Sequence, residues 1–187
     1  MPPGTGLWIV IGIAVAVVLA LIVIYNGLVQ ARMRVKNAFS QIEVQLKRRY
    51  DLIPNLVETV KGYASHEKET LERVIAARNR GMSAHGVAEQ AAAENMLSGA
   101  LRQLFALSEA YPDLKANENF ARLQEELTST ENKIGFARQH YNNVVENYNT
   151  RIQSVPAVFV AGLFGFQQEE FFEIDDPISR EPVKVKF

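Results

Sequence analysis

The side chains that could do chemistry in this 187-residue chain are few and widely spaced. With no cysteine, the sequence offers neither a disulfide framework nor a thiol nucleophile. His66, His85 and His140 are too scattered for an HExxH motif or another metal-site spacing. The sequence contains no Walker loop and no GxSxG, and its GLFG stretch follows a helix end instead of a strand. We therefore expect no catalytic residue, no metal site and no cofactor.

The polar residues that most invite a functional interpretation surround a proline, in QLKRRYDLIPNLVETVKGYA. Pro54 cannot donate to the carbonyl of Tyr50 and crowds it, so a helix should bend here. In the architectural interpretation, the bend wraps the helix around a core, and Asp51 and Asn55 bond the freed backbone groups. In another structural interpretation, Asp51 caps a new helix, with Pro54 in its first turn. The functional interpretation is a notch for a partner or small ligand, lined by Arg49, Asp51, Asn55 and Glu58.

The N-terminal segment predicts a membrane anchor. No charged side chain precedes Arg32, and residues 7–25, LWIVIGIAVAVVLALIVIY, are almost wholly apolar. About 20 apolar residues of helix cross a bilayer core, and Trp8 and Tyr25 stand at the two ends, where aromatic rings favour the interface. A cleaved signal would need a basic start, a shorter apolar stretch and a small-x-small cleavage site. We expect an uncleaved transmembrane helix with its juxtamembrane start over residues 7–31.

The basic residues that follow this segment predict its orientation. Because they resist translocation, we expect a single-pass protein of the cell membrane with its N-terminus outside and its body cytoplasmic. Arg48 would lie roughly 25 Å beyond the span at 1.5 Å per residue, so it suits a solvated face or an ion pair between helices, as does Arg49. Basic groups near the bilayer attract anionic headgroups by about 1 kcal/mol each. The candidates for such contacts are Arg32, Arg34 and Lys36.

Two long stripes of apolar residues predict the first and last helices of the body. Apolar positions recur at steps of three and four, the pattern of a helix with one buried face. The first stripe runs from Val35 to Tyr63 and passes Arg49 without losing register. The last runs from Phe120 to Ile152, and a proline shortly afterwards ends it.

Two shorter helices are expected between them. Ser65 can cap a helix over residues 65–80, which has acidic residues early and basic residues late. Glycines at 81 and 86 then indicate a break, and an alanine-rich helix follows over residues 87–110. The two helices could also run together across the glycines.

Long helices, short connectors and no strand period predict an all-α protein. The expected fold is a single-pass N-terminal transmembrane helix followed by an antiparallel up-and-down four-helix bundle. The predicted parts are a short segment 1–6, the anchor 7–31, the bundle 32–153 and an apolar then acidic tail 154–187.

Asparagine is frequent in the last helix although it is a poor helix former. These side chains predict either a polar network between helices or recognition of a neighbouring subunit. The stretch that follows, SVPAVFVAGLFGF, is apolar but too short to span a bilayer. The candidate interaction surface comprises Asn142, Asn143, Asn147, Phe159, Phe164 and Phe166.

Three motifs in order resemble the LemA family. They are QIEVQLKRRYDLIPNLVETVKGYASHE, LFALSEAYPDLKANENFARLQEELTSTENKI and ARQHYNNVVENYNTRIQSVPAVFVAGLFGF. The similarity covers nearly the whole chain, including the apolar segment followed by YNGLVQ. The resemblance implies a membrane-anchored, up-and-down four-helix bundle of bacteria, and it implies no catalytic residues.

The expected function is therefore a non-enzymatic membrane scaffold that binds proteins, including copies of itself. The expected partners are the lipid bilayer, further copies and other membrane proteins, whereas a net charge of -1 gives no sign of nucleic-acid binding. An alternative is a lipid-interacting or membrane-shaping module that uses residues 155–166. A small-ligand sensor at the Pro54 notch is a third hypothesis.

Overall fold

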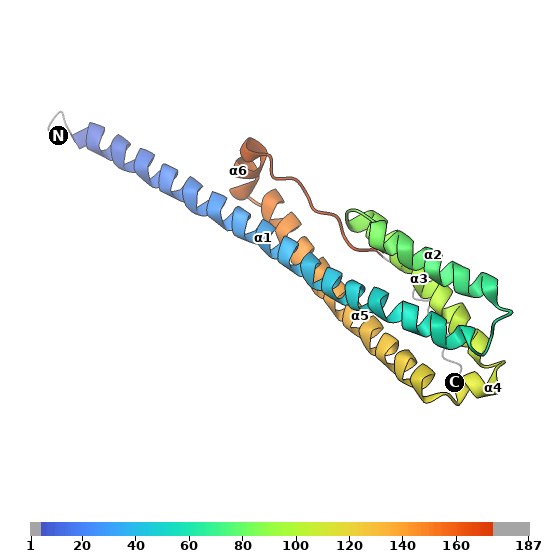
Figure 1. The fold of residues 1–187 in the computed structure, drawn as a ribbon. Helices are drawn as coiled ribbons and strands as arrows, with labels where there is room; N and C mark the ends of the chain where they lie inside the picture. The colour runs from blue at the N-terminus through green and yellow to red at the C-terminus, as the bar shows by residue number, and fades with distance from the viewer. Residues whose placement is uncertain (1–4, 174–187) are drawn as a thin grey trace, which may run out of the picture. The chain divides into compact units, whose positions relative to one another are not determined.

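The computed structural model describes residues 5–173, and every regular element in this range is an α-helix, as expected. The acidic end of the tail, beyond residue 173, lies outside the described residues. The helices, labelled in Figure 1, are α1 (Thr5–Lys61), α2 (Lys68–Ser83), α3 (Val87–Ser108), α4 (Pro112–Lys115), α5 (Glu118–Gln153) and α6 (Ala157–Phe164).

The chain forms two compact units, each of which takes part of α1 and part of α5. Among the described residues, unit 1 comprises residues 5–39 and 140–169, so it also contains α6. Unit 2 comprises residues 40–139 and 170–173, so it contains α2, α3 and α4.

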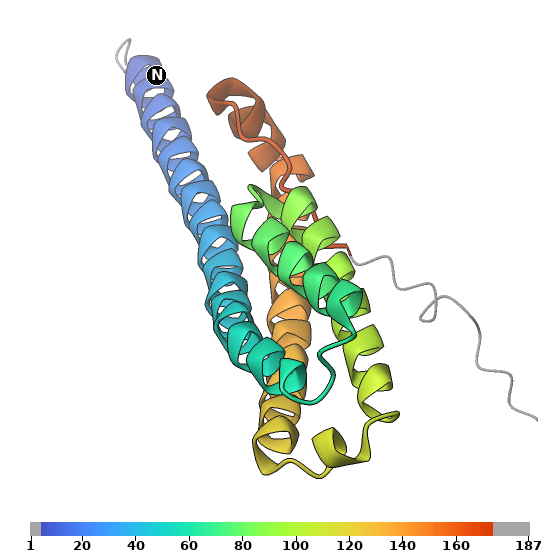
Figure 2. The same ribbon diagram turned by 45° about the vertical axis from the view of Figure 1, so that its right-hand side comes forward.

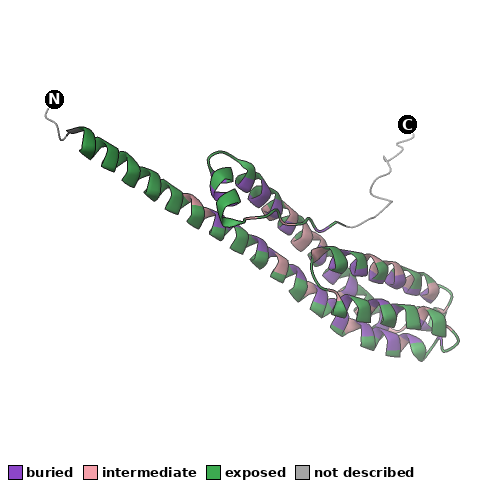
Figure 3. Cartoon of the chain, turned by 90° about the horizontal axis from the view of Figure 1, so that it is seen from above, coloured by how far each residue is buried: buried purple, intermediate pink, exposed green. Residues whose placement is uncertain are grey.

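The apolar beginning of α1, in unit 1, is exposed at every residue from 6 to 23 (Figure 3). Trp8 is 74% exposed and Val23 is 70% exposed. Within the described range, this is the one helix long and apolar enough to cross a membrane, and none of its most apolar window is buried. From Leu28 onwards α1 buries one face only. The helix therefore changes from an all-round apolar surface to a one-sided one without a break.

In unit 1 the last part of α5 packs against α1. A side chain at Gly27 would meet the guanidinium of Arg151, and the rings of Phe39 and Tyr141 lie 5.7 Å apart. These two contacts show that the helices run antiparallel here. The buried apolar side chains contributed by this part of α5 are Tyr141, Val145, Tyr148 and Ile152.

In unit 2, α2 and α3 lie side by side as a helical hairpin (Figures 1 and 2). The expected break is real and covers residues 84–86, where Gly86 has a φ of 80°, in the left-handed region that glycine adopts at little cost. The expected start at Ser65 and end near residue 80 are each off by three residues, because α2 begins at Lys68 and continues through Gly81.

The first predicted stripe supplies much of the core of unit 2. Five of its apolar side chains are at most 2% exposed, whereas Tyr63 at its end is 43% exposed. The buried five are Ile42, Leu46, Ile53, Leu56 and Val60. The periodicity therefore identifies the buried face of α1 correctly up to its last turn.

Pro54 lies inside α1, which continues through it to Lys61. The interpretation that Asp51 caps a new helix is therefore wrong. The carbonyl of Tyr50, which Pro54 cannot bond, accepts a hydrogen bond from Nε of Arg78 at 2.9 Å. A side chain from α2, and not a neighbour along α1, thus replaces the backbone donor that proline lacks.

We predict that Arg78 and Pro54 are energetically coupled. Arg78→Ala should lower the free energy of unfolding by roughly 1–2 kcal/mol, because it leaves the Tyr50 carbonyl without its partner. In a Pro54→Ala background the amide at position 54 can donate to that carbonyl, so the same change should cost much less. Urea unfolding of the four proteins in mild detergent gives the double-mutant cycle. An equal cost in both backgrounds would contradict this account.

Candidate functional site

A buried ionic cluster joins three helices in unit 2. Arg49 occupies a core-facing position in the apolar repeat of α1 and is 3% exposed. Its Nη1 lies 3.0 Å from Oε2 of Glu94 in α3 and 2.9 Å from Oε2 of Glu131 in α5. Its Nη2 donates to Oγ of Ser98, also in α3, at 2.9 Å. One guanidinium thus links α1, α3 and α5.

The second carboxylate oxygen of Glu94 is also engaged. It accepts a hydrogen bond from the hydroxyl of Tyr50, and that hydroxyl accepts one from Nε2 of Gln90 at 2.8 Å. Gln90 also donates to the carbonyl of Gly81 at 3.2 Å. A Cβ at Gly81 would lie 2.5 Å from the Tyr50 oxygen, so the close approach of α2 to this hydroxyl requires glycine.

The electrostatics of the cluster favour a hydroxyl that stays protonated. Burial raises the pKa of the Tyr50 hydroxyl, and its hydrogen bond to Glu94 raises it further. Burial also raises the pKa of Glu94, against the opposing effects of the Tyr50 hydrogen bond and the Arg49 charge. The Glu94 side chain is 2% exposed, so a substrate could not reach the carboxylate without opening the helices. The geometry suits a cluster that holds α1, α3 and α5 together better than one that transfers a proton.

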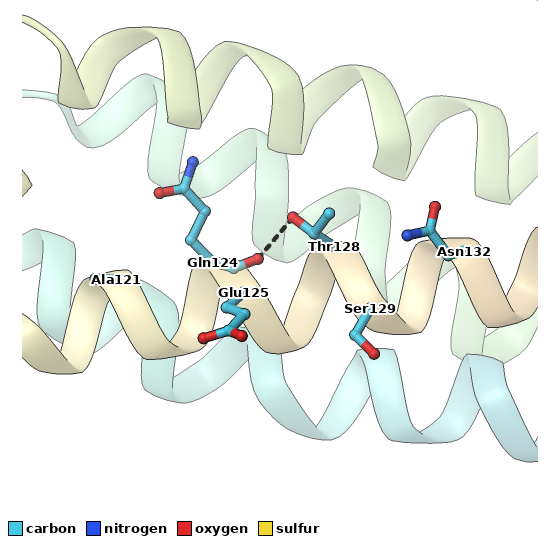
Figure 4. A pocket seen from close by; sticks show the side chains of 6 residues that line it. All are labelled: Ala121, Gln124, Glu125, Thr128, Ser129 and Asn132. Carbon is cyan, nitrogen blue, oxygen red and sulfur yellow. Dashed lines mark hydrogen bonds between the residues drawn. The ribbon is translucent and has the colours of Figure 1, made fainter.

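Two hollows lie on unit 2 beside this cluster. One, of about 240 Å³, has Arg49 and Ser98 among its lining residues together with Arg102, Glu131 and the apolar Leu127. The other is an open depression on the surface of α5 (Figure 4). It is lined by Ala121, Gln124, Glu125, Thr128, Ser129 and Asn132.

The structure separates the residues of the predicted notch. Asp51, Pro54, Asn55 and Glu58 are exposed, whereas Arg49 is buried. The carbonyl of Asn55 accepts a hydrogen bond from the hydroxyl of Thr59 at 2.8 Å. The exposed residues follow one another on α1, but the arginine that was to complete the notch belongs to the buried cluster.

The predicted headgroup contacts are accessible. Arg32, Arg34 and Lys36 are all exposed on the part of α1 that belongs to unit 1. Nε of Arg32 lies 3.8 Å from a carboxylate oxygen of Glu169. Sequence reasoning missed Arg151, which α5 brings to Gly27, nearer to the apolar segment than any of these three.

The apolar stretch after α5 forms α6, which has two different faces. One face is buried through Ala157, Val160 and Ala161. The other is exposed, with Phe159 at 72% and Leu163 at 77%. Two aromatic residues at the end of this segment contact Tyr25, at ring-centre distances of 4.8 Å for Phe164 and 5.8 Å for Phe166.

The predicted asparagines do not form one cluster. Asn143 and Asn147 are exposed, and Nδ2 of Asn147 donates to the carbonyl of Asn143 at 2.7 Å, while Asn142 is half-buried and already engaged. The asparagine that organises its surroundings is Asn149, which is buried. The Asn149 side chain donates a hydrogen bond to the backbone carbonyl of Glu169 and accepts one from the backbone amide of Glu169, at 2.9 Å each. The sequence signal that could have identified Asn149 is its place on the buried face of α5, directly after Tyr148.

We predict that Arg49 is far more important for stability than its neighbour Arg48. Arg49→Met should cost about 3–5 kcal/mol of unfolding free energy, because it leaves the Glu94 carboxylate buried without its counter-ion. Adding Glu94→Leu should restore a large part of that loss. Arg48 is exposed, so Arg48→Met should stay within about 0.5 kcal/mol of the parent. If thermal and urea unfolding found the two arginine variants equally mild, the cluster would not hold the helices together.

Comparison with known proteins finds one matching family model and several relatives. Residues 38–187 match the model of the LemA family. Protein LemA of Metamycoplasma hominis is 28% identical over 132 residues, which span 68% of this chain and 58% of that relative. Magnetosome protein MamQ 2 of Paramagnetospirillum magneticum is 24% identical over an alignment of length 195, which covers 90% of this chain and 71% of that relative. Magnetosome protein MamQ of Magnetospirillum gryphiswaldense gives the same identity and coverage.

Proposed function

The chain belongs to the LemA family, and on that premise we propose that it is a membrane-anchored helical scaffold that binds other proteins, including copies of itself, and catalyses no reaction. The anchor is a single transmembrane pass within residues 7–31, with the N-terminus outside the cell membrane. The body is a cytoplasmic, antiparallel four-helix bundle built from α1, α2, α3 and α5.

The observation that carries the anchor is the exposure of the apolar part of α1. Its most apolar window has a mean hydropathy of 3.3 and none of it is buried. Trp8 and Tyr25 are separated by about 26 Å along the helix axis, close to the ~30 Å thickness of a bilayer core. Burying each large apolar side chain is worth about 1.5–3 kcal/mol, so water is a poor surrounding for this segment and lipid a good one.

The scaffold role is supported by how the body uses its charged groups. Arg49 and Glu94 are buried against each other, and among the described residues every buried side-chain nitrogen or oxygen has a hydrogen-bond partner. The names of the relatives, Protein LemA and Magnetosome protein MamQ, name no reaction. Large apolar side chains are nevertheless exposed on the body, with Phe136 at 73% and Val44 at 64%, and such side chains are available for contacts with other proteins.

Self-association is supported by small residues in the anchor. Gly12, Ala16 and Ala20 recur every four residues, so they share one face of α1, and all three are exposed. In lipid, a small-xxx-small face lets two helix backbones approach closely and gain packing contacts. The anchor therefore has a face suited to a second copy of itself.

A second candidate function is a lipid-interacting or membrane-shaping module, and the exposed apolar face of α6 favours it. Phe159 and Leu163 point away from the packed part of unit 1, as their exposures of 72% and 77% indicate. A helix of this length cannot cross a bilayer, but it can lie in the interface.

Two charges placed in the anchor should release the protein from membranes. A charged residue at the centre of a membrane helix costs about 2.5–3.5 kcal/mol on the insertion scale. We expect the parent chain to stay in the membrane pellet after alkaline carbonate extraction and Ile13→Asp with Val17→Asp to move to the supernatant. Val44→Asp, also exposed on α1 but in unit 2, is the matched control and should stay in the pellet. Release of the parent chain would refute the anchor.

Bulky residues on the small face should weaken self-association. Gly12→Leu with Ala16→Leu should reduce the association constant at least tenfold, which is about 1.4 kcal/mol, because the backbones can no longer approach. Ile11→Leu with Val18→Leu keeps the hydropathy but lies on the opposite face of the helix and should have little effect. Light scattering in mild detergent reports the mass of each protein. A monomeric parent, or equal weakening by both pairs, would count against this interface.

A further inference from the structure

We propose that Arg151 and α6 together form a binding site for an anionic phospholipid at the end of the membrane anchor. In this site Arg151 binds the lipid phosphate, and the exposed face of α6 lies among the adjoining acyl chains. The inference rests on the proposed membrane anchor and names a lipid partner for it. All the residues involved belong to unit 1.

Arg151 lies at the depth where headgroup phosphates are expected. If a Cβ were added to Gly27, it would lie 3.2 Å from Cζ of Arg151, so the guanidinium rests against the backbone of α1. Gly27 follows Tyr25 by two residues, or about 3 Å of helix, whereas Arg32 is roughly 10 Å beyond Tyr25. Arg151 is also exposed, and its planar fork can bind two phosphate oxygens at once.

The position of α6 is set by contacts with the same turn of α1. The ring of Tyr25 lies 4.8 Å from that of Phe164 and 5.8 Å from that of Phe166, so the end of α6 meets the end of the apolar segment. The exposed face of α6 is apolar throughout. It comprises Val158, Phe159, Leu163 and Phe164, and the exposed Val155 lies two residues before the helix.

The chain after α6 is tied down, which keeps α6 at this level. Tyr148 donates its hydroxyl hydrogen to the carbonyl of Gln167 at 3.0 Å. Asn149 makes a paired hydrogen bond with the backbone of Glu169. The Glu169 carboxylate, which would repel an anionic lipid, is offset by Arg32 at 3.8 Å. The site is therefore held in place by unit 1 before any lipid binds.

Continuity with the anchor identifies the occupant as lipid. The exposed apolar face of α6 meets the exposed apolar surface of α1 at Tyr25, so whatever solvates the end of the anchor also meets α6. A lipid satisfies both halves of the site, because its phosphate suits the arginine and its acyl chains suit α6. A water-soluble phosphate compound would satisfy Arg151 alone.

The test uses the full chain with single cysteines, since the sequence has none of its own. An environment-sensitive fluorophore is attached at Phe159→Cys on α6, at Val17→Cys in the anchor, or at Phe136→Cys on unit 2. Each protein is reconstituted into phosphatidylcholine vesicles containing phosphatidylglycerol, with a nitroxide quencher on one of the two lipids. We expect strong quenching at 159 and 17 and little at 136.

The headgroup preference tests Arg151. Quenching at 159 should be at least twofold stronger when phosphatidylglycerol carries the nitroxide, and Arg151→Gln should abolish that preference. Arg138→Gln, on the same helix but in unit 2, is the matched control and should preserve it. Inorganic phosphate added at constant ionic strength should also leave the preference intact.

The outcomes separate this site from the anchor. Quenching at 17 without quenching at 159 would overturn the lipid site while the anchor stands, whereas no quenching at 17 would overturn the anchor itself. Equal quenching by the two lipids, or a preference that survives Arg151→Gln, would overturn the role of Arg151. A preference abolished by inorganic phosphate would show that Arg151 takes free phosphate and not lipid.

Discussion

The structure depends on keeping one helix unbroken while its surroundings change. α1 runs from Thr5 to Lys61, beginning with an apolar surface on all sides and continuing with one buried face. Two residues in its second half are ordinarily unfavourable there. A proline removes a hydrogen bond from the helix, and an arginine at a core position places a charge in the buried face. Arg78 supplies a hydrogen bond to the carbonyl that Pro54 leaves free, and Glu94 with Glu131 balances Arg49. Each problem in α1 is therefore solved by a side chain from another helix of unit 2.

The Arg49 cluster specifies an arrangement more than it adds stability. Removing two charges from water is expensive, and a buried pair often does no better than apolar residues of the same size. Its geometry is nevertheless selective, because the guanidinium meets Glu94, Ser98 and Glu131 at once, at 2.9–3.0 Å. A shift of α1 by one turn would leave both Arg49 and Glu94 buried without partners. We infer that the cluster fixes the register of α1 against α3 and α5, as buried polar groups do in coiled coils.

The helices could largely be predicted from the sequence, whereas the partners of the polar residues could not. Apolar steps of three and four identify the buried faces of α1 and α5, because they follow from helix geometry alone. The proline was correctly expected to free the Tyr50 carbonyl, but Arg78 is 28 residues away and periodicity does not reveal which helices meet. Glu94 lies in an alanine-rich helix and resembles a solvated residue until Arg49 is placed against it. Asn149 differs from the exposed Asn143 and Asn147 only by its face of α5.

In the proposed function, the apolar part of α1 lies in the bilayer and the rest of the chain lies outside it. The decisive measurement is the labelling of single cysteines along α1 with a membrane-impermeant maleimide, in intact cells and in permeabilised cells. Cysteines at positions 9, 17 and 23 should not react, although all three positions are exposed in the structure, whereas cysteines at positions 34 and 37 should react once the cells are permeabilised. Equal reactivity at 17 and 37 would show that the apolar part of α1 is not in the bilayer, and reaction at 37 in intact cells would reverse the orientation.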